Sequence, residues 1–195
     1  MKGNKISGIC ILLGLVLILA SVGLLLWQNF RAQNARVDTA AILDKTLSQL
    51  PPAVDAVPEA RGNNAMPSRQ IDGVDVIGVL EFSRQGRVLP LAGDWHTDRV
   101  NSLPCRFTGS IYDSSLIIGA VDSQDQIPFA DSLEVGDGIV LTDMEGGCYH
   151  YRVAAIHHAK HATRSKLQQG DYPLTIFVKD SQNDQYLLIR CEIGK

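Results

Sequence analysis

A lysine stands where an apolar run ends in the stretch PLTIFVKDSQNDQYLLIRCE, which runs from Pro173 to Glu192. An ε-amine acts as a nucleophile only when burial or a neighbouring cation lowers its pKa. Asp180 directly follows Lys179 and favours the charged amine instead. Lys179 is therefore predicted to be a solvated lysine at a strand end, and not an amine nucleophile.

Thiols are the second source of nucleophilic or metal-binding chemistry. After the first 30 residues the cysteines are Cys105, Cys148 and Cys191, with no CxxC pair and no histidine at metal-ligand spacing. No histidine is placed by sequence to activate any of them, and an unassisted thiol is mostly protonated at neutral pH. Three thiols allow at most one internal disulfide, and each is expected to be a small buried residue.

Three histidines gather in the segment HHAKH, at His157, His158 and His161. Adjacent residues of a strand point to opposite faces, so His157 and His158 do not converge. Lys160 lies within the same segment and would repel a metal cation. The segment is predicted to be a surface loop after a strand, and neither a metal nor a cofactor is expected.

Composition excludes one class of partner. The 195 residues carry a net charge of -3 at pH 7, from 18 Lys and Arg against 21 Asp and Glu. Nucleic-acid binding would need a basic face, so no nucleic-acid partner is expected. This length is enough for one compact domain with appendages.

The segment from Ile6 to Trp27 has no charged residue. At about 1.5 Å per residue, a helix of this length spans a hydrocarbon core of roughly 30 Å. A cleaved signal peptide is the alternative, but its apolar core would be shorter, and LASVG around Ala20 is a poor cleavage site. Residues 6–27 are therefore predicted to be a transmembrane anchor.

Charges around this segment set its orientation. Lys2 and Lys5 precede it, Arg31 and Arg36 follow it, and the amino terminus adds one positive charge to the N-terminal side. The positive-inside rule then favours a short cytoplasmic N-terminus of residues 1–5. We expect a single-pass protein of the plasma membrane with an extracytoplasmic C-terminal domain.

Residues 28–70 are predicted to be an extracytoplasmic linker. Arg31 to Leu50 has a helical apolar stripe, and Pro51 to Pro67 has four prolines among small and polar residues. The folded domain is predicted to occupy residues 71–195.

The pattern from Ile71 onward is β. Apolar runs such as VDVIGVLEF, SLIIGAV and LTIFV alternate with turns, and the turn MEGG joins DGIVLTD to CYHYRVAAI as a hairpin. DQIPFADSL is expected to form a short helix or turn ahead of that hairpin. Many short strands predict a mostly β, closed or sandwiched domain.

The order of these pieces resembles the sortase family, the cysteine transpeptidases of Gram-positive surfaces. The likeness covers Val76 to Glu192 and rests on IGVLEF, LPLAGDW, LPCRFTGSIYDSSLIIGA, FADSLEVGDGIVLTDMEGGCYHYRV, DYPLTIFVKD and YLLIRCE, in that order. The fourth of these is similar to the family's F-x-x-L-x-x-L-x-x-G-D segment. The resemblance implies a closed β-barrel with short helices behind the N-terminal transmembrane helix.

The resemblance also shows which chemical groups are missing. Sortases use a cysteine nucleophile, a histidine that handles protons and an arginine that stabilises the oxyanion. The matching positions here are Lys179, Val121 and Tyr186. Arg190 lies on the same strand face as Tyr186 but about 13 Å further along, so it is not expected to replace the catalytic arginine.

The resemblance implies a place for a ligand as well. In sortases the segment before the nucleophile strand lines the groove that binds the sorting signal. By position, this groove carries over to His157, His158 and Leu167, with Thr175 and Phe177 on the strand itself.

Three functional hypotheses follow. The favoured one is a membrane-anchored, catalytically inactive pseudosortase that binds a sorting-signal peptide, a pilin or an active sortase at the cell surface. The alternative is an active transpeptidase or hydrolase with a relocated nucleophile. The third is a structural module in which Val121, Phe177 and Tyr186 fill the former site. A fold alone does not choose among them.

Overall fold

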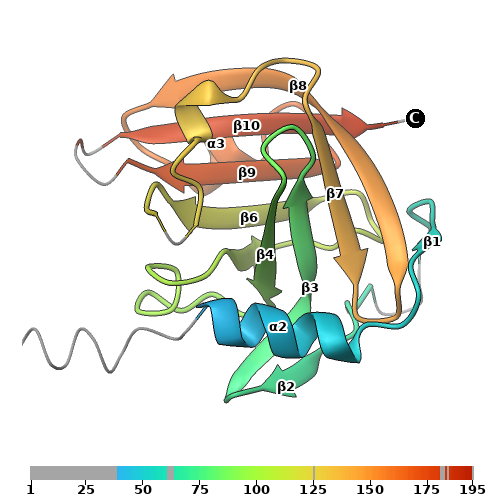
Figure 1. The fold of residues 1–195 in the computed structure, drawn as a ribbon. Helices are drawn as coiled ribbons and strands as arrows, with labels where there is room; N and C mark the ends of the chain where they lie inside the picture. The colour runs from blue at the N-terminus through green and yellow to red at the C-terminus, as the bar shows by residue number, and fades with distance from the viewer. Residues whose placement is uncertain (1–38, 61–63, 125, 181–182, 184, 195) are drawn as a thin grey trace, which may run out of the picture. The chain divides into compact units, whose positions relative to one another are not determined.

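The structure is a computed structural model that describes residues 39–60, 64–124, 126–180, 183 and 185–194 (Figure 1). The predicted cytoplasmic N-terminus, the transmembrane segment and the start of the predicted linker lie outside the described residues. No helix in the described part of the chain is long and apolar enough to span a membrane.

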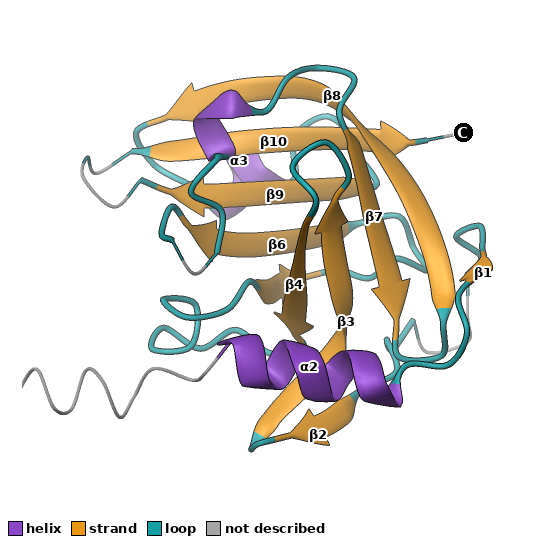
Figure 2. Ribbon diagram, viewed as in Figure 1, coloured by secondary structure: helices purple, strands orange, loops and turns teal. Residues whose placement is uncertain are grey.

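Eight strands form a closed barrel, as the resemblance implied (Figure 2). Pairing runs from β3 through β4, β5, β6, β9, β10, β8 and β7 back to β3. The β4–β5 and β6–β9 pairs are parallel and the other pairs are antiparallel. The strands are β3 Val74–Phe82, β4 Arg87–Ala92, β5 Cys105–Thr108, β6 Leu116–Val121, β7 Gly138–Asp143, β8 Gly147–Ala159, β9 Leu174–Lys179 and β10 Tyr186–Ile193.

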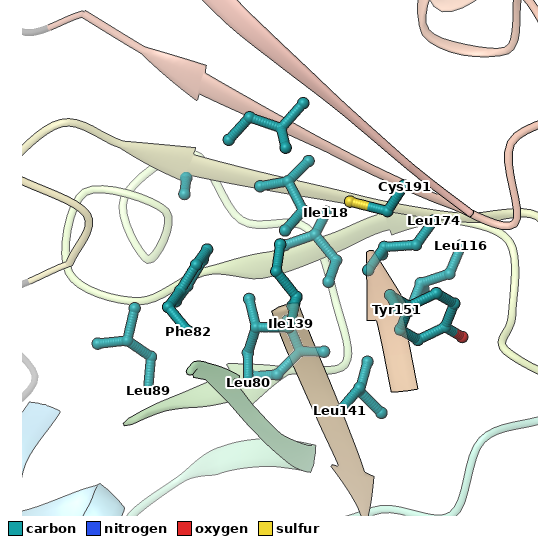
Figure 3. Packing of buried hydrophobic residues seen from close by; sticks show 14 of the residues in the cluster. Leu80, Phe82, Leu89, Leu116, Ile118, Ile139, Leu141, Tyr151, Leu174 and Cys191 are labelled. Carbon is teal, nitrogen blue, oxygen red and sulfur yellow. The ribbon is translucent and has the colours of Figure 1, made fainter. Parts of the chain in front are cut away.

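Alternating side chains fill the inside of the barrel. In β7, with the sequence GIVLTD, the residues Ile139, Leu141 and Asp143 are buried and their neighbours are half-buried. This alternation is the period of two that a strand with one face on the core requires. Figure 3 shows Ile139 and Leu141 inside the barrel with Leu80, Phe82 and other apolar side chains of the core.

The predicted hairpin of β7 and β8 is present, and a buried carboxylate holds its turn. Asp143 accepts hydrogen bonds from the N–H groups of Glu145 and Gly147, both at 2.9 Å. It also accepts hydrogen bonds from the hydroxyl of Tyr112 at 3.1 Å and that of Tyr149 at 3.3 Å. Four donors therefore satisfy a carboxylate that has no exposed surface. The predicted short helix ahead of the hairpin is the 3₁₀ helix η1, Ala130–Ser132.

The predicted boundary at Ile71 is wrong, because residues assigned to the linker fold onto the barrel. Helix α2, Thr39–Gln49, buries Ile42 and Thr46, and the compact unit extends from Asp38 to Lys195. Strand β1, Val54–Asp55, pairs in parallel with β8, and β2, Arg69–Ile71, pairs with β3. The prolines that suggested a flexible stalk end the helix instead, so that the chain turns back along β8.

Candidate functional site

The three positions that the resemblance to sortases equates with catalytic residues lie side by side in the barrel. Val121 at the end of β6 pairs with Lys179 at the end of β9, and Lys179 pairs with Tyr186 at the start of β10. The N–H group of Asp122 donates to the carbonyl of Lys179 at 2.8 Å and continues this pairing beyond β6. We call Val121, Lys179 and Tyr186 the row. Its register brings together positions that are far apart in the sequence.

The row has none of the groups that acyl transfer by a thiol requires. Val121 and Tyr186 are half-buried and Lys179 is exposed. That chemistry uses a thiolate as nucleophile, an imidazole for proton transfer and a guanidinium to stabilise the oxyanion. Valine, lysine and tyrosine supply none of these three groups. The three residues of the row are close together and partly accessible, as a reactive site requires, but their side chains lack the groups for thiol-dependent acyl transfer.

The described thiols are buried and form no disulfide, and only Cys191 belongs to the core inside the barrel. Cys105 and Cys191 have no exposed surface, and Cys148 is 9% exposed. Burial raises the pKa of Cys105 from 9.0 to about 11 and that of Cys191 from 9.0 to about 12. A thiol held in its protonated form and out of reach of a substrate is a poor nucleophile. The prediction of small buried residues is confirmed.

Aromatic side chains cover the outer face next to the row. Phe177 is 5% exposed and packs against Trp95, Phe107 and Tyr186, with ring centroids 5.6, 5.5 and 6.4 Å away. A Cβ atom at Gly119 would lie 2.3 Å from the Trp95 ring and 2.5 Å from the Phe177 ring, so only glycine fits there. Phe177, expected in a groove, therefore lies under Trp95.

A small acidic pocket lies beside the row. It has a volume of about 230 Å³, and its lining includes Asp122, Asp131, Asp180, His158 and Tyr186. Burial, together with repulsion from Asp131 and Asp180, raises the pKa of Asp122. The described residues contain no group of three or more His, Cys, Asp or Glu that could hold a metal ion.

Arg190 lies at the other end of the same outer face and is 4% exposed. Its Nη1 donates to Thr175 Oγ1 at 2.8 Å and to the carbonyl of Leu167, and its Nη2 donates to the carbonyl of Lys166. Burial lowers the pKa of Arg190. Arg190 pairs with Thr175, whereas Tyr186 pairs with Lys179. The guanidinium therefore holds the segment above the strands and is not directed to the row.

Comparisons of sequence alone find no match to a protein-family model and no significant match to a curated protein. Solved structures do match. Sortase C1 of Streptococcus agalactiae has a TM-score of 0.54 at 21% identity, over 64% of this chain and 70% of that one. Clostridium perfringens sortase C, solved with the C-terminal cell wall sorting motif, has a TM-score of 0.53 at 20% identity, over 68% and 80%. Sortase A of Listeria monocytogenes has a TM-score of 0.54 at 16% identity, over 62% and 88%.

The chain has a sortase-like fold. In this sortase-like barrel, Leu167 and Phe177 belong to one buried cluster on the outer face, together with Ile117 and Leu188. Thr175 and Leu167 are buried around Arg190, and Phe177 is packed under Trp95. His157 lies on β8 in the same row of paired residues as Phe177, because both pair with Leu188 of β10.

The prediction of a surface loop at His157 and His158 is wrong. Strand β8 continues to Ala159, because His157 pairs with Leu188 and His158 pairs with Leu187 on β10. Both histidines are exposed, as expected for this segment, but they are held in a regular strand. His161 follows the end of the strand and is also exposed.

Sequence reasoning missed Trp95 as a residue of the outer face. The stretch LPLAGDW is one of the pieces that carry the resemblance, but β4 ends at Ala92 and Trp95 lies in the connection to β5. The available signal was a large aromatic residue directly after Gly93 and Asp94 in a polar connection. Trp95 remains 38% exposed, so part of its ring packs on Phe177 and Gly119 and the rest faces solvent.

Proposed function

We propose that this protein is a membrane-anchored pseudosortase, a catalytically inactive sortase-like protein that binds a partner at the cell surface. The observation that carries the proposal is the row. In a sortase-like barrel, Val121, Lys179 and Tyr186 are paired neighbours at the positions where the family resemblance places histidine, cysteine and arginine. Three replacements on three adjacent strands remove every chemical role of the family's mechanism at once.

The buried thiols give independent support. A relocated cysteine would have to reach a substrate carbonyl as a thiolate with a base beside it. Cys105 and Cys191 are fully buried, and burial raises the pKa of each. Cys148 contacts Thr142 Oγ1 at 3.2 Å. This arrangement favours inactivity over the alternative of an active enzyme with a relocated nucleophile.

The ligand we propose first is a sorting-signal peptide, with a pilin or an active sortase as the other surface partners. Binding does not require the catalytic groups, because groove walls and backbone hydrogen bonds supply peptide affinity. A pocket of about 430 Å³ remains on the outer face between β6 and the segment that follows helix α3, Arg164–Leu167. Its lining includes Ser115, Ile117, Leu167, Tyr172 and Thr175.

Incubation of the full-length protein, in a neutral detergent, with sorting-signal peptides and an amine acceptor tests both parts of the proposal. We expect shifts in the NMR resonances of Ile117 and Tyr172 and no cleavage of any peptide by mass spectrometry. A cleaved peptide or an acyl-enzyme adduct would overturn the claim of inactivity. If no resonance shifts and no peptide is cleaved, the peptide is excluded as the ligand. Crosslinking would then be used to search for a protein partner.

Restoring the family residues tests whether only chemistry was lost. The triple variant Val121→His, Lys179→Cys and Tyr186→Arg is expected to cleave a bound sorting-signal peptide, and a thiol alkylating agent should abolish that cleavage. The matched control carries Lys179→Ser with the other two changes and should remain inactive. A triple variant that binds peptide but does not cleave it would mean that the row does not face the scissile bond.

A structural module with a closed cleft is the second candidate, and the packing of Trp95 over Gly119 and Phe177 favours it. Replacing Trp95 with alanine distinguishes the two candidates. Under the pseudosortase proposal the native protein binds the peptide, and Trp95→Ala changes the affinity without creating it. Binding by the Trp95→Ala variant alone would favour the closed module.

A further inference from the structure

A third pocket lies on the outer side of β8 and β10, and its residues His158 and Ala159 border the row. It has a volume of about 680 Å³ and is bounded by the ends of these strands and by the segment around α3, Arg164–Leu167. Figure 2 shows α3 in front of the sheet that contains β10, and the hydrogen bonds of Arg190 to the carbonyls of Lys166 and Leu167 join the two. We call it the basic pocket. It is lined by His157, His158, Ala159, Lys160, His161, Lys166, Gln169, Gly170, Tyr172, Leu188 and Arg190.

Its charge differs from that of the whole chain. Six of the lining residues are Lys, Arg or His and none is Asp or Glu, although the chain has a net charge of -3. Lys160, Lys166 and Arg190 form no ion pair with a carboxylate among the described residues. Three permanent cations held together without an anion repel one another, so an anionic ligand would relieve that repulsion.

Arg190 is the buried member of this cluster. Three of its five N–H groups donate to Thr175 Oγ1 and to the carbonyls of Leu167 and Lys166. The other two, on Nε and Nη2, have no hydrogen bond to a described residue. A guanidinium that is 4% exposed keeps its charge most easily when an anion is near. The hydrogen bonds to Thr175, Leu167 and Lys166 also fix the orientation of the guanidinium group.

Apolar surface completes the pocket. Tyr172 packs against Arg190, with the guanidinium carbon 5.7 Å from the ring centroid. Gly170 allows this packing, because a Cβ atom there would lie 2.6 Å from the Tyr172 ring. Leu188 and Ala159 supply further apolar surface. The pocket thus combines an anion site with room for the body of a larger molecule.

We propose that the basic pocket binds a phosphate group carried by a larger, partly apolar molecule. Arginine and lysine recognise phosphate through charge-assisted hydrogen bonds, and the histidine rings offer further donors. A phosphate ester matches the three permanent cations better than a single carboxylate, because it carries more oxygens and up to two charges. A soluble phosphate ester and a phospholipid headgroup present the same group. This inference does not depend on the proposed function, because it requires neither the row nor a sorting-signal peptide, although Tyr172 lines both this pocket and the pocket of about 430 Å³.

Titration of the full-length protein with inorganic phosphate, with phenyl phosphate, and with detergent micelles that contain phosphatidylglycerol tests the proposal. Micelles that contain phosphatidylcholine are the matched lipid control, because that phosphate is neutralised by its own headgroup. NMR resonances of His157, Lys160, Gly170 and Tyr172 report on the pocket. We expect phenyl phosphate to bind more tightly than inorganic phosphate, and we expect added salt to weaken both.

A pair of variants separates this site from general electrostatic attraction. Lys166→Gln, which removes a lining cation, is expected to weaken binding of phenyl phosphate about fivefold. Arg164→Gln removes an exposed cation of the same helix that does not line the pocket, and it should leave the affinity unchanged. Equal losses in the two variants would overturn the proposal.

The source of the phosphate follows from which ligands bind. Shifts with phenyl phosphate support a soluble ester, and shifts with phosphatidylglycerol micelles alone support a lipid headgroup. The absence of pocket shifts with all three phosphates, or shifts with phosphatidylcholine equal to those with phosphatidylglycerol, would overturn the proposal.

Discussion

At one end of the outer face of β9 and β10, Arg190 is buried and donates hydrogen bonds to Thr175 and to the carbonyls of α3. At the other end, Tyr186 is half-buried and Lys179 is exposed beside an acidic pocket. The same two strands thus carry an anchored end and an open end. The difference indicates that Arg190 serves the structure, while Lys179 and Tyr186 are the accessible positions of the two strands.

Removing Arg190 should have the largest effect on this contrast. Arg190→Met deletes three hydrogen bonds and leaves the carbonyls above the sheet without their donor, so we expect the free energy of unfolding to fall by about 3 kcal/mol. Chemical denaturation measures the change. Arg152→Met, at an exposed arginine of neighbouring β8, is the control and should have little effect. Equal losses in both variants would mean that Arg190 is no anchor.

A thiol placed in the row should react far faster than the native thiols. In Lys179→Cys the new thiol is at an exposed position, whereas burial raises the pKa of Cys191 to about 12. A pKa two or more units higher lowers the thiolate fraction about 100-fold at mildly alkaline pH. Iodoacetamide labelling followed by mass spectrometry compares the rates. Because a raised pKa keeps the thiol protonated, labelling of Cys191 should increase only as pH approaches that value. Equal rates would show that the row is covered.

The Thr175 hydroxyl should have a smaller effect at the anchored end. Thr175→Val keeps the shape but removes the acceptor that lies 2.8 Å from Arg190 Nη1. We expect a loss of about 1 kcal/mol in the free energy of unfolding. Thr97→Val, in an exposed connection, should show no measurable loss. An unchanged free energy of unfolding in Thr175→Val would mean that Arg190 stabilises the fold only through its hydrogen bonds to the two backbone carbonyls.

Changes at the open end should have the smallest effect on stability. Lys179→Met and Tyr186→Phe remove polar groups from exposed or half-buried side chains, and each should change the free energy of unfolding by less than about 0.5 kcal/mol. Thermal unfolding of the two variants beside the native protein checks this. A loss comparable to that of Arg190→Met would remove the distinction between the two ends.

Local patterns predicted much of the barrel. The alternation in β7 and the glycines of the turn to β8 specify a hairpin from a few neighbouring residues, and Gly146 takes the positive φ of +86° that its turn requires. The resemblance to sortases implied that Val121, Lys179 and Tyr186 share one site, and the register places them side by side. Such features depend on short-range geometry and on the order of strands along the chain.

Other features depend on contacts between distant segments. Three such features have no local sequence signal as strong as that of the β7–β8 hairpin. They are the packing of α2 and β1 onto the barrel, the position of Trp95 over Gly119 and the continuation of β8 through His158. Prolines and polar residues suit a free linker as well as one that returns along a strand. The prediction of a linker failed for that reason.

The sequence by itself determined which chemical groups exist: a valine, a lysine and a tyrosine at the three positions, and few thiols elsewhere. Side-chain chemistry is a property of residue type, so no fold can turn Val121 into a base. The tertiary structure alone decided which groups are accessible and how they ionise. It buried Cys105 and Cys191, and it gathered Lys160, Lys166 and Arg190 around one pocket. Burial and proximity in space set these properties, because the free energy of a charge depends on the solvent and the charges around it.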